Sequence, residues 1–272
     1  MKKQSKLKTM SALIATVSLG SVATSQATLV AHWTFDSDFT ADAGGSNYDL
    51  TPENGATAGD VAGQFGNAAD FDRAASQYAF TGGDVLSPGA DYTYSAWYNM
   101  NVDDITGSDR YFVLETSAGD TPSGTGAWTA SIGLRETGGD VAQIFTHPST
   151  AVGTVSYVAN MWNHIAVTFD ADGGTTGGII NAYLNGSATP FATLDDVATS
   201  TAVGGLVIGG HRAGTGRNFD GQIDDVAFWD NVLSTAEIQS LQTNTANNVI
   251  PEPSGTVLLS LGMLAFVMHR RK

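Results

Sequence analysis

The chain has 272 residues and a formal net charge of −15, which its parts share unevenly. Residues 28–249 hold 26 of the 27 acidic residues and 5 of the 12 basic ones, so this body carries −21. That charge excludes non-specific binding to nucleic acid, which needs clustered cations, and it argues against docking on an anionic membrane surface. The absence of cysteine excludes a disulfide scaffold, an iron–sulfur cluster, a thiolate zinc site and a cysteine nucleophile.

Residues 1–27 have the pattern of a secretory signal peptide. Four lysines between Lys2 and Lys8 precede an apolar stretch from Met10 to Val22, and Ser25–Ala27 supplies small residues for cleavage. The alternative is a short core helix, but a run of lysines is an unusual start for a buried element. We therefore expect an exported protein that loses this segment.

Residues 28–243 have the pattern of one all-β domain. Short alternating or β-branched runs recur between Gly, Asp, Asn and Thr clusters, as in a two-sheet sandwich of jelly-roll type. The predicted strands lie near Leu29–Phe35, Ala68–Phe71, Tyr78–Phe80, Tyr92–Asn99, Arg110–Glu115, Ala127–Leu134, Val141–Phe145, Val152–Tyr157, Asn163–Asp170, Ile179–Leu184, Gly205–Ile208 and Gln222–Trp229.

One helix is predicted after the last strand. Ser234 lies three residues before Glu237, which is the spacing of a capping box. We expect the helix to cover Thr235–Thr243 and to pack on the sandwich.

The C-terminal end divides into two parts. Residues 244–253 form a polar linker that ends in a Pro-Glu-Pro motif, and residues 254–272 form a short apolar membrane segment with a basic tail. The apolar stretch is short for a span, which usually needs about 17–25 residues. The terminal cations would remain on the cytoplasmic side and leave the body outside.

This ending resembles the PEP-CTERM sorting signal of exported proteins of Gram-negative bacteria. The matching residues are Pro251, Glu252, Pro253, Arg270 and Arg271, in the order of that signal. The resemblance implies processing by an exosortase-type sorting enzyme, so that the tail is a transient membrane anchor. An ordinary single-span anchor is the alternative.

Several body segments resemble a LamG-like jelly-roll domain of the concanavalin A-like lectin/glucanase superfamily. The resemblance covers about residues 28–243 and rests on Leu29–Asp36, Gly66–Phe71, Trp162–Asp170, Tyr183–Gly186, Leu206–Gly210 and Phe219–Trp229. It implies two curved antiparallel sheets of six or seven strands each. Because this fold carries lectins, glycosidases and structural modules, the fold alone does not establish a function.

The same resemblance implies a structural calcium ion that joins the first strand to the last. Asp36 and Asp38 follow the first strand, Asp224 lies in the last, and Gly66 is placed to offer a carbonyl oxygen. Calcium takes 6–8 oxygen ligands, so carboxylates, carbonyls and water suit it. The alternative is that these aspartates cap turns or face water.

A glycoside hydrolase is the alternative function. The glucanases of this fold carry their catalytic carboxylates on alternate residues of one strand, in a glutamate-any-aspartate-any-glutamate pattern. The body contains no such pattern, and its four glutamates, at positions 53, 115, 136 and 237, are scattered. We therefore expect a protein that is not an enzyme.

Four residues are candidates for ligand binding. Trp128 follows a Gly/Ser/Thr-rich stretch, and the loop His211–Asp220 carries Arg212, Arg217 and Asn218. Arginine offers a planar fork of donors that suits sugar hydroxyls and carboxylates. The alternatives are that Trp128 packs in the core and that the arginine-containing loop is a solvated hairpin loop.

Three further tryptophans, Trp33, Trp97 and Trp162, are predicted core residues because their strands are strongly apolar. We therefore expect an exported, non-catalytic binding or structural module of the cell envelope or extracellular matrix. Its expected partner is a polysaccharide or another surface protein. The charge of the body favours neutral or cation-bridged glycans.

Overall fold

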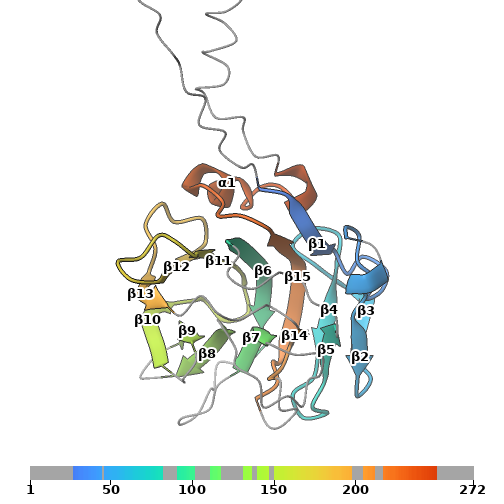
Figure 1. Ribbon diagram of the computed structural model, residues 1–272. Helices are drawn as coiled ribbons and strands as arrows, with labels where there is room; N and C mark the ends of the chain where they lie inside the picture. The colour runs from blue at the N-terminus through green and yellow to red at the C-terminus, as the bar shows by residue number, and fades with distance from the viewer. Residues whose placement is uncertain are drawn as a thin grey trace, which may run out of the picture. The chain divides into compact units, whose positions relative to one another are not determined.

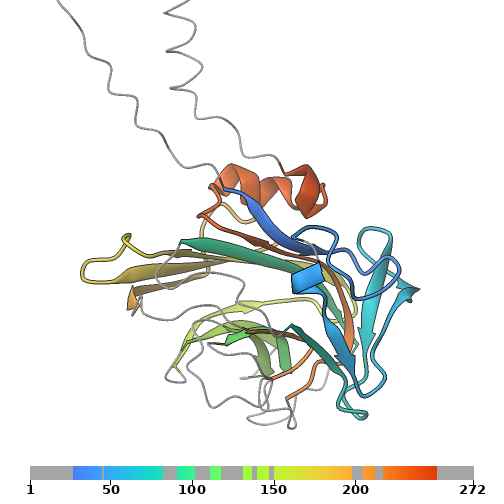
Figure 2. The same ribbon diagram turned by 45° about the vertical axis from the view of Figure 1, so that its right-hand side comes forward.

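The computed structural model describes residues 27–44, 46–81, 91–101, 111–117, 131–136, 140–146, 150–197, 205–211 and 217–249. These residues belong to one compact unit, Gln26–Pro251. Their strands form two antiparallel sheets, which Figure 2 shows as two layers. The all-β sandwich predicted from the sequence is confirmed.

The first sheet has eight strands in the described residues, in the order β13–β12–β11–β6–β15–β4–β3, with β1 also paired to β15 (Figure 1). The central strands β6, β11 and β15 are almost wholly buried along most of their length. The strands are β1 (Leu29–Trp33), β3 (Thr57–Ala62), β4 (Asn67–Phe71), β6 (Tyr92–Met100), β11 (Trp162–Asp170), β12 (Gly178–Leu184), β13 (Ala192–Val197) and β15 (Gly221–Trp229).

The second sheet has seven strands in the described residues, in the order β10–β9–β8–β7–β14–β5–β2. Its central strand β7 carries a bulge between Phe112 and Leu114 against β8. The strands are β2 (Thr51–Glu53), β5 (Tyr78–Thr81), β7 (Tyr111–Ser117), β8 (Ser131–Glu136), β9 (Asp140–Thr146), β10 (Thr150–Ser156) and β14 (Gly205–Ile208).

Alternate residues of β6 fill the core between the sheets. Tyr92, Tyr94 and Tyr98 face inward, and the Tyr94 ring stacks on Phe228 with centroids 5.3 Å apart. Burial raises the pKa of Tyr94 and Tyr98 well above that of a free tyrosine. Since strand residues alternate between faces, the intervening residues of β6 must lie on the outer face of the first sheet.

A helix covers part of that outer face, as the orange-red segment above β1 and β15 in Figure 1 shows. It is α1 (Thr235–Ser240), and its capping box is present as predicted: the Ser234 hydroxyl accepts from Glu237 N–H and the Glu237 carboxylate accepts from Ser234 N–H. The helix is shorter than expected, because residues 241–243 form turns. The apolar cluster under it contains Ala166, Ala227, Trp229, Leu233, Ile238, Leu241, Ala246 and Val249.

The segment after the helix also packs on the domain. A 3-10 turn, η2 (Ala246–Asn248), follows α1, while a second one, η1 (Ser46–Tyr48), lies after β1. Ala246 is wholly buried and Val249 is 6% exposed. The polar segment predicted as a linker therefore remains part of the domain as far as Val249.

Candidate functional site

The turn between β3 and β4 is held by two of the aspartates predicted as calcium ligands. Asp36 Oδ1 accepts a hydrogen bond from Asn67 N–H at 2.8 Å, and Asp224 Oδ2 accepts one from Phe65 N–H at 2.8 Å. Gly66 lies between them with φ of +66°, where any side chain would overlap the Asp36 carboxylate. The structure thus brings Asp36, Gly66 and Asp224 to one turn.

Asp38, the fourth predicted ligand, acts within its own turn. Its Oδ1 accepts from the backbone N–H of Thr40 at 2.8 Å and from the Thr40 hydroxyl at 2.5 Å. These hydrogen bonds lower the pKa of Asp38. Asp38 therefore caps its own turn, which is the alternative to a role as a calcium ligand.

Asp224 is the unusual member of the group, because its side chain is wholly buried. Burial raises its pKa to about 7, although the backbone N–H groups of Phe65 and Asp225 lower it. A cation beside a carboxylate favours its ionised form, and an all-oxygen set suits calcium.

The donor set fits calcium only with help from the backbone. Among the described residues there is no group of three or more His, Cys, Asp or Glu side chains that could hold a metal ion. Two carboxylates would therefore have to be joined by carbonyl oxygens and water, which calcium accepts readily. Asp36, Asp224 and Gly66 are the residues that would hold it.

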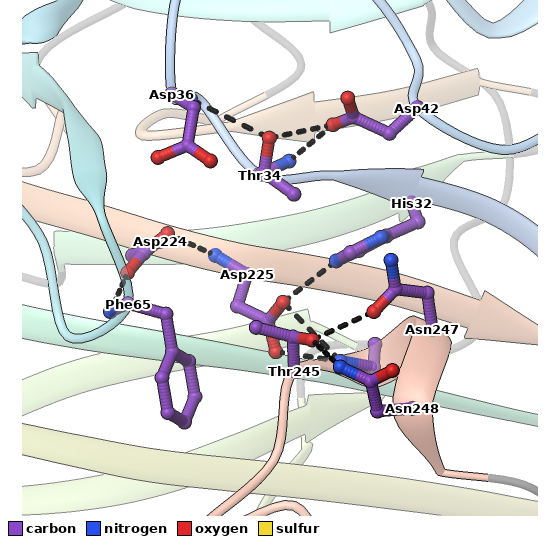
Figure 3. Close-up of polar contacts among 11 residues, drawn as sticks. His32, Thr34, Asp36, Asp42, Phe65, Asp224, Asp225, Thr245, Asn247 and Asn248 are labelled. Atoms are coloured by element: carbon purple, nitrogen blue, oxygen red, sulfur yellow. Dashed lines mark hydrogen bonds and ion pairs between the residues drawn. The ribbon is translucent and has the colours of Figure 1, made fainter.

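Asp225 points to other partners, as Figure 3 shows. It has φ of +46°, and the pairing of β15 with β6 shifts register at this point, which is a bulge. Its carboxylate lies 2.6 Å from His32 Nε2 and accepts from Ala246 N–H at 3.1 Å. Asp225 therefore joins the first strand, the last strand and η2.

A second cluster lies on the outer face of the second sheet. His211 Nε2 lies 3.4 Å from Arg217 Nη1 and 3.7 Å from Glu115 Oε1. The imidazole also packs against the Phe112 ring, with centroids 5.2 Å apart. Glu115 is wholly buried and His211 is 11% exposed, whereas Arg217 is exposed, so the cluster runs from the sheet outward to solvent. We call Phe112, Glu115, His211 and Arg217 the arginine cluster.

Gln143 adds a polar atom to the same face. It pairs with Gly133, which pairs with Phe112, and directly paired residues of antiparallel strands share a face. Gln143 is 6% exposed, and its Oε1 is buried without a hydrogen-bond partner. Buried acceptors are normally satisfied, so this oxygen indicates a place for a donor from water or a ligand.

The predicted ligand-binding residues have different outcomes. Arg217 belongs to the arginine cluster. Asn218 is a structural residue, since it is 1% exposed and donates to Gln77 O at 3.0 Å. Trp128 and Arg212 lie outside the described residues.

Sequence reasoning gave no ligand-binding role to Glu115, Phe112 or His211. Strict alternation along β7 would place Phe112 and Glu115 on opposite faces, because they are three residues apart. The bulge at Val113 brings them to the same face. The contact of His211 with Glu115 joins the segment after β14 to β7, which lies far away in the chain, and nothing in either segment signals it.

Both terminal predictions also fall outside the described residues. These are the signal peptide and the sorting motif with Pro251, Glu252, Pro253, Arg270 and Arg271. Within the described part of the chain, no helix is long and apolar enough to cross a membrane.

The fold and a family profile agree on the class of protein. A laminin G-type profile, described as the concanavalin A-like lectin/glucanases superfamily, matches residues 72–239. The chain belongs to this superfamily. No curated protein sequence matches the chain.

Solved structures share the fold at low sequence identity. Domain 4 of AbnA, an extracellular arabinanase from Geobacillus stearothermophilus solved with arabinotriose, has a TM-score of 0.58 and 18% identity, over 80% of this chain and all of that domain. The binding domain of Paraclostridial Mosquitocidal Protein 1 has a TM-score of 0.56 and 14% identity, over 80% of this chain and 52% of its own. The botulinum neurotoxin serotype D ligand-binding domain, solved with N-acetylneuraminic acid, has a TM-score of 0.52 and 12% identity, over 77% of this chain and 51% of its own.

Proposed function

We propose that the protein is an exported, non-catalytic carbohydrate-binding module stabilised by calcium. The arginine cluster carries the proposal. It combines an exposed guanidinium, an imidazole and a buried carboxylate with the Phe112 ring, on one face of a rigid sheet. Ligand sites typically place a few fixed polar groups against aromatic surface in this way.

The backbone of the cluster is held by the second sheet. Glu115 and Phe112 belong to β7, and the backbone N–H of Phe112 donates to Arg217 O at 3.2 Å. The backbone of the arginine is therefore tied to the strand that holds the carboxylate, which reduces the entropy lost on binding. The carbohydrate complexes of AbnA domain 4 and of the botulinum neurotoxin D domain support a sugar as the ligand class.

The spacing of carboxylates supports binding rather than hydrolysis. A glycosidase needs two carboxyl groups about 5–9.5 Å apart. Among the described residues of this face, Glu53 in β2 and Glu115 in β7 are three strands apart in the sheet order. At about 4.8 Å between strands, that separation is about 14 Å. Such a pair cannot act on one glycosidic bond.

Export and sorting complete the proposal and rest on the two ends of the sequence. The signal-like start would deliver the domain across the inner membrane, and the PEP-CTERM-like end would hold it there until an exosortase-type enzyme removes the tail. The finished module would then belong to the envelope or extracellular matrix, with a polysaccharide as its partner.

The arginine cluster is tested by titrating the full chain with arabinotriose, cellohexaose and laminarihexaose in a calorimeter. Arg217→Ala should weaken the binding of the best ligand by about tenfold or more, the cost of one charged hydrogen-bonding group. The affinity of Arg217→Lys should lie between that of the unaltered protein and that of Arg217→Ala, because lysine keeps the charge but lacks the planar fork. Unchanged affinity in both variants would reject this site.

A further inference from the structure

A row of side chains crosses five strands of the first sheet on its outer face. The partners in register are, from one edge inward, Thr57, Asp70, Gln222, Asn99 and Trp162, on β3, β4, β15, β6 and β11. Directly paired residues share a face. Their chain neighbours, such as Ala69, Tyr98 and Ile223, lie in the core between the sheets, so the row faces away from it. We call these five residues the polar row.

The polar row is reachable from solvent, unlike the next row toward the helix. Thr57 is exposed and the other four residues are half-buried. The next row consists of Asp224, Trp97 and His164, all buried. The outer face thus opens at the polar row.

One buried polar atom of the row has no hydrogen-bond partner. Gln222 Nε2 donates to Asp70 Oδ1 at 2.9 Å, so these two side chains satisfy each other. Asn99 Oδ1, which lies beside them in register, is buried and has no partner. An acceptor in that state costs folding free energy unless a donor from outside meets it.

The Trp162 end of the row is apolar and rigid. Val158 and Met161, 55% and 59% exposed, are the large hydrophobic residues exposed in the described part of the chain, and they lie in the turn that leads into Trp162. The Asn163 side chain holds that turn: its Nδ2 donates to Val158 O and Met161 O, and its Oδ1 accepts from Val158 N–H. The backbone of this turn is therefore held in place beside Trp162.

These features match one ligand chemistry. We propose that the polar row binds a neutral oligosaccharide chain, independently of the arginine cluster. The C–H face of a sugar ring packs on an aromatic ring such as that of Trp162, and amide groups meet hydroxyls. The row has no cation to pair with an acidic sugar, and the Asp70 carboxylate would repel one. Four strand spacings make it about 19 Å long, which suits a chain rather than a single sugar.

A second site would change what the module does. The polar row lies on the outer face of one sheet, and the arginine cluster lies on the outer face of the other. One molecule could therefore bind two polysaccharide chains and join them, with the gain in avidity that two linked sites give.

The test is a nuclear magnetic resonance titration of the full chain with cellohexaose, laminarihexaose, arabinohexaose and hexagalacturonate. At least one neutral hexasaccharide should shift the Trp162 indole and Asn99 amide signals. Asn99→Ala should weaken that binding about fivefold or more, and Trp162→Met, which keeps apolar packing without a flat ring, about tenfold. Asn181→Ala is the matched control, since Asn181 is half-buried on the same face of β12, paired with Thr168 and outside the row.

The outcomes separate this site from the arginine cluster. Arg217→Ala should leave the shifts of Trp162 and Asn99 unchanged, even if it abolishes binding at the cluster. The proposal is wrong if no neutral hexasaccharide shifts these signals, if only hexagalacturonate does, or if Asn99→Ala binds as well as Asn181→Ala.

Discussion

Two buried ionisable residues flank Trp97 on the outer face of the first sheet, and burial shifts their pKa values in opposite directions. The pKa of His164 is lowered to about 3, and that of Asp224 is raised to about 7. Below pH 6.5, the ordinary pKa of histidine, the imidazole is protonated in the unfolded chain but stays neutral where it is buried in the folded protein. His164 therefore lowers stability as the pH falls from about 6.5 toward 3.

Asp224 acts with the opposite sign. Between about pH 4 and 7 the folded state keeps a proton that the unfolded state has lost, so stability falls as the pH rises through this window. A shift of about three units corresponds to about 4 kcal/mol at most. A calcium ion beside the carboxylate would remove this cost, because it stabilises the charged form.

The calcium proposal therefore predicts a pH-dependent stabilisation. In 1 mM calcium, compared with a chelator, the melting temperature should rise more at pH 8 than at pH 5, because at pH 5 the metal must displace a proton from Asp224. With a pKa of about 7, this displacement weakens binding about 100-fold at pH 5. Using the difference between calcium and chelator at each pH cancels the contribution of His164.

Asp224→Asn is the control for this measurement. The variant should show no calcium response at either pH, whatever its own stability. A calcium increment of equal size at pH 5 and pH 8, or one that persists in Asp224→Asn, would contradict the proposed site.

At the scale of elements, Asp225 joins three segments that are far apart in the sequence. Its carboxylate contacts His32 in β1 and the N–H of Ala246 in η2, while its own backbone forms the bulge in β15. His32 is wholly buried and Asp225 is 2% exposed. Removing one partner of a buried pair leaves the other unsatisfied, which costs about 3–5 kcal/mol.

Asp225→Ala should therefore lower the melting temperature and release η2 from the sheet. Hydrogen exchange should become faster at residues 246–249 and in β1, more than in the distant strands β8–β10. Asp230→Ala is the matched control, because this exposed aspartate accepts from Thr28 N–H nearby and its loss should cost about 1 kcal/mol. Equal exchange in the two variants would show that Asp225 does not hold the segment.

The strands that were predicted from the sequence and those that were missed differ in amino-acid composition. Every predicted strand is present, because each has an apolar alternation or a β-branched run. In the described residues, the strands that were missed are β2, β3 and β13. Their sequences TPE, TAGDVA and ATLDDV contain Pro, Gly or Asp, which are depleted in strands. Each lies at an end of its sheet, where one side of a strand needs no partner.

At the scale of the whole molecule, the sequence supported the fold better than the sites. The jelly-roll class follows from pattern and resemblance, and Asp36, Gly66 and Asp224, three of the residues predicted as calcium ligands, meet at one turn. Trp162 was predicted to lie in the core, but it is half-buried and faces outward, because the apolar run of β11 covers both faces of a buried strand. The polar row depends on register between five strands, and single-strand patterns do not specify register.

The central claim is that the molecule binds carbohydrate without cleaving it. The most direct measurement is a calorimetric titration of the full chain, in calcium, with arabinotriose, cellohexaose and laminarihexaose, followed by a reducing-end assay of the same samples after prolonged incubation. The account predicts saturable binding of at least one of these sugars and no new reducing ends. Release of reducing ends, or failure of all three sugars to bind, would contradict it.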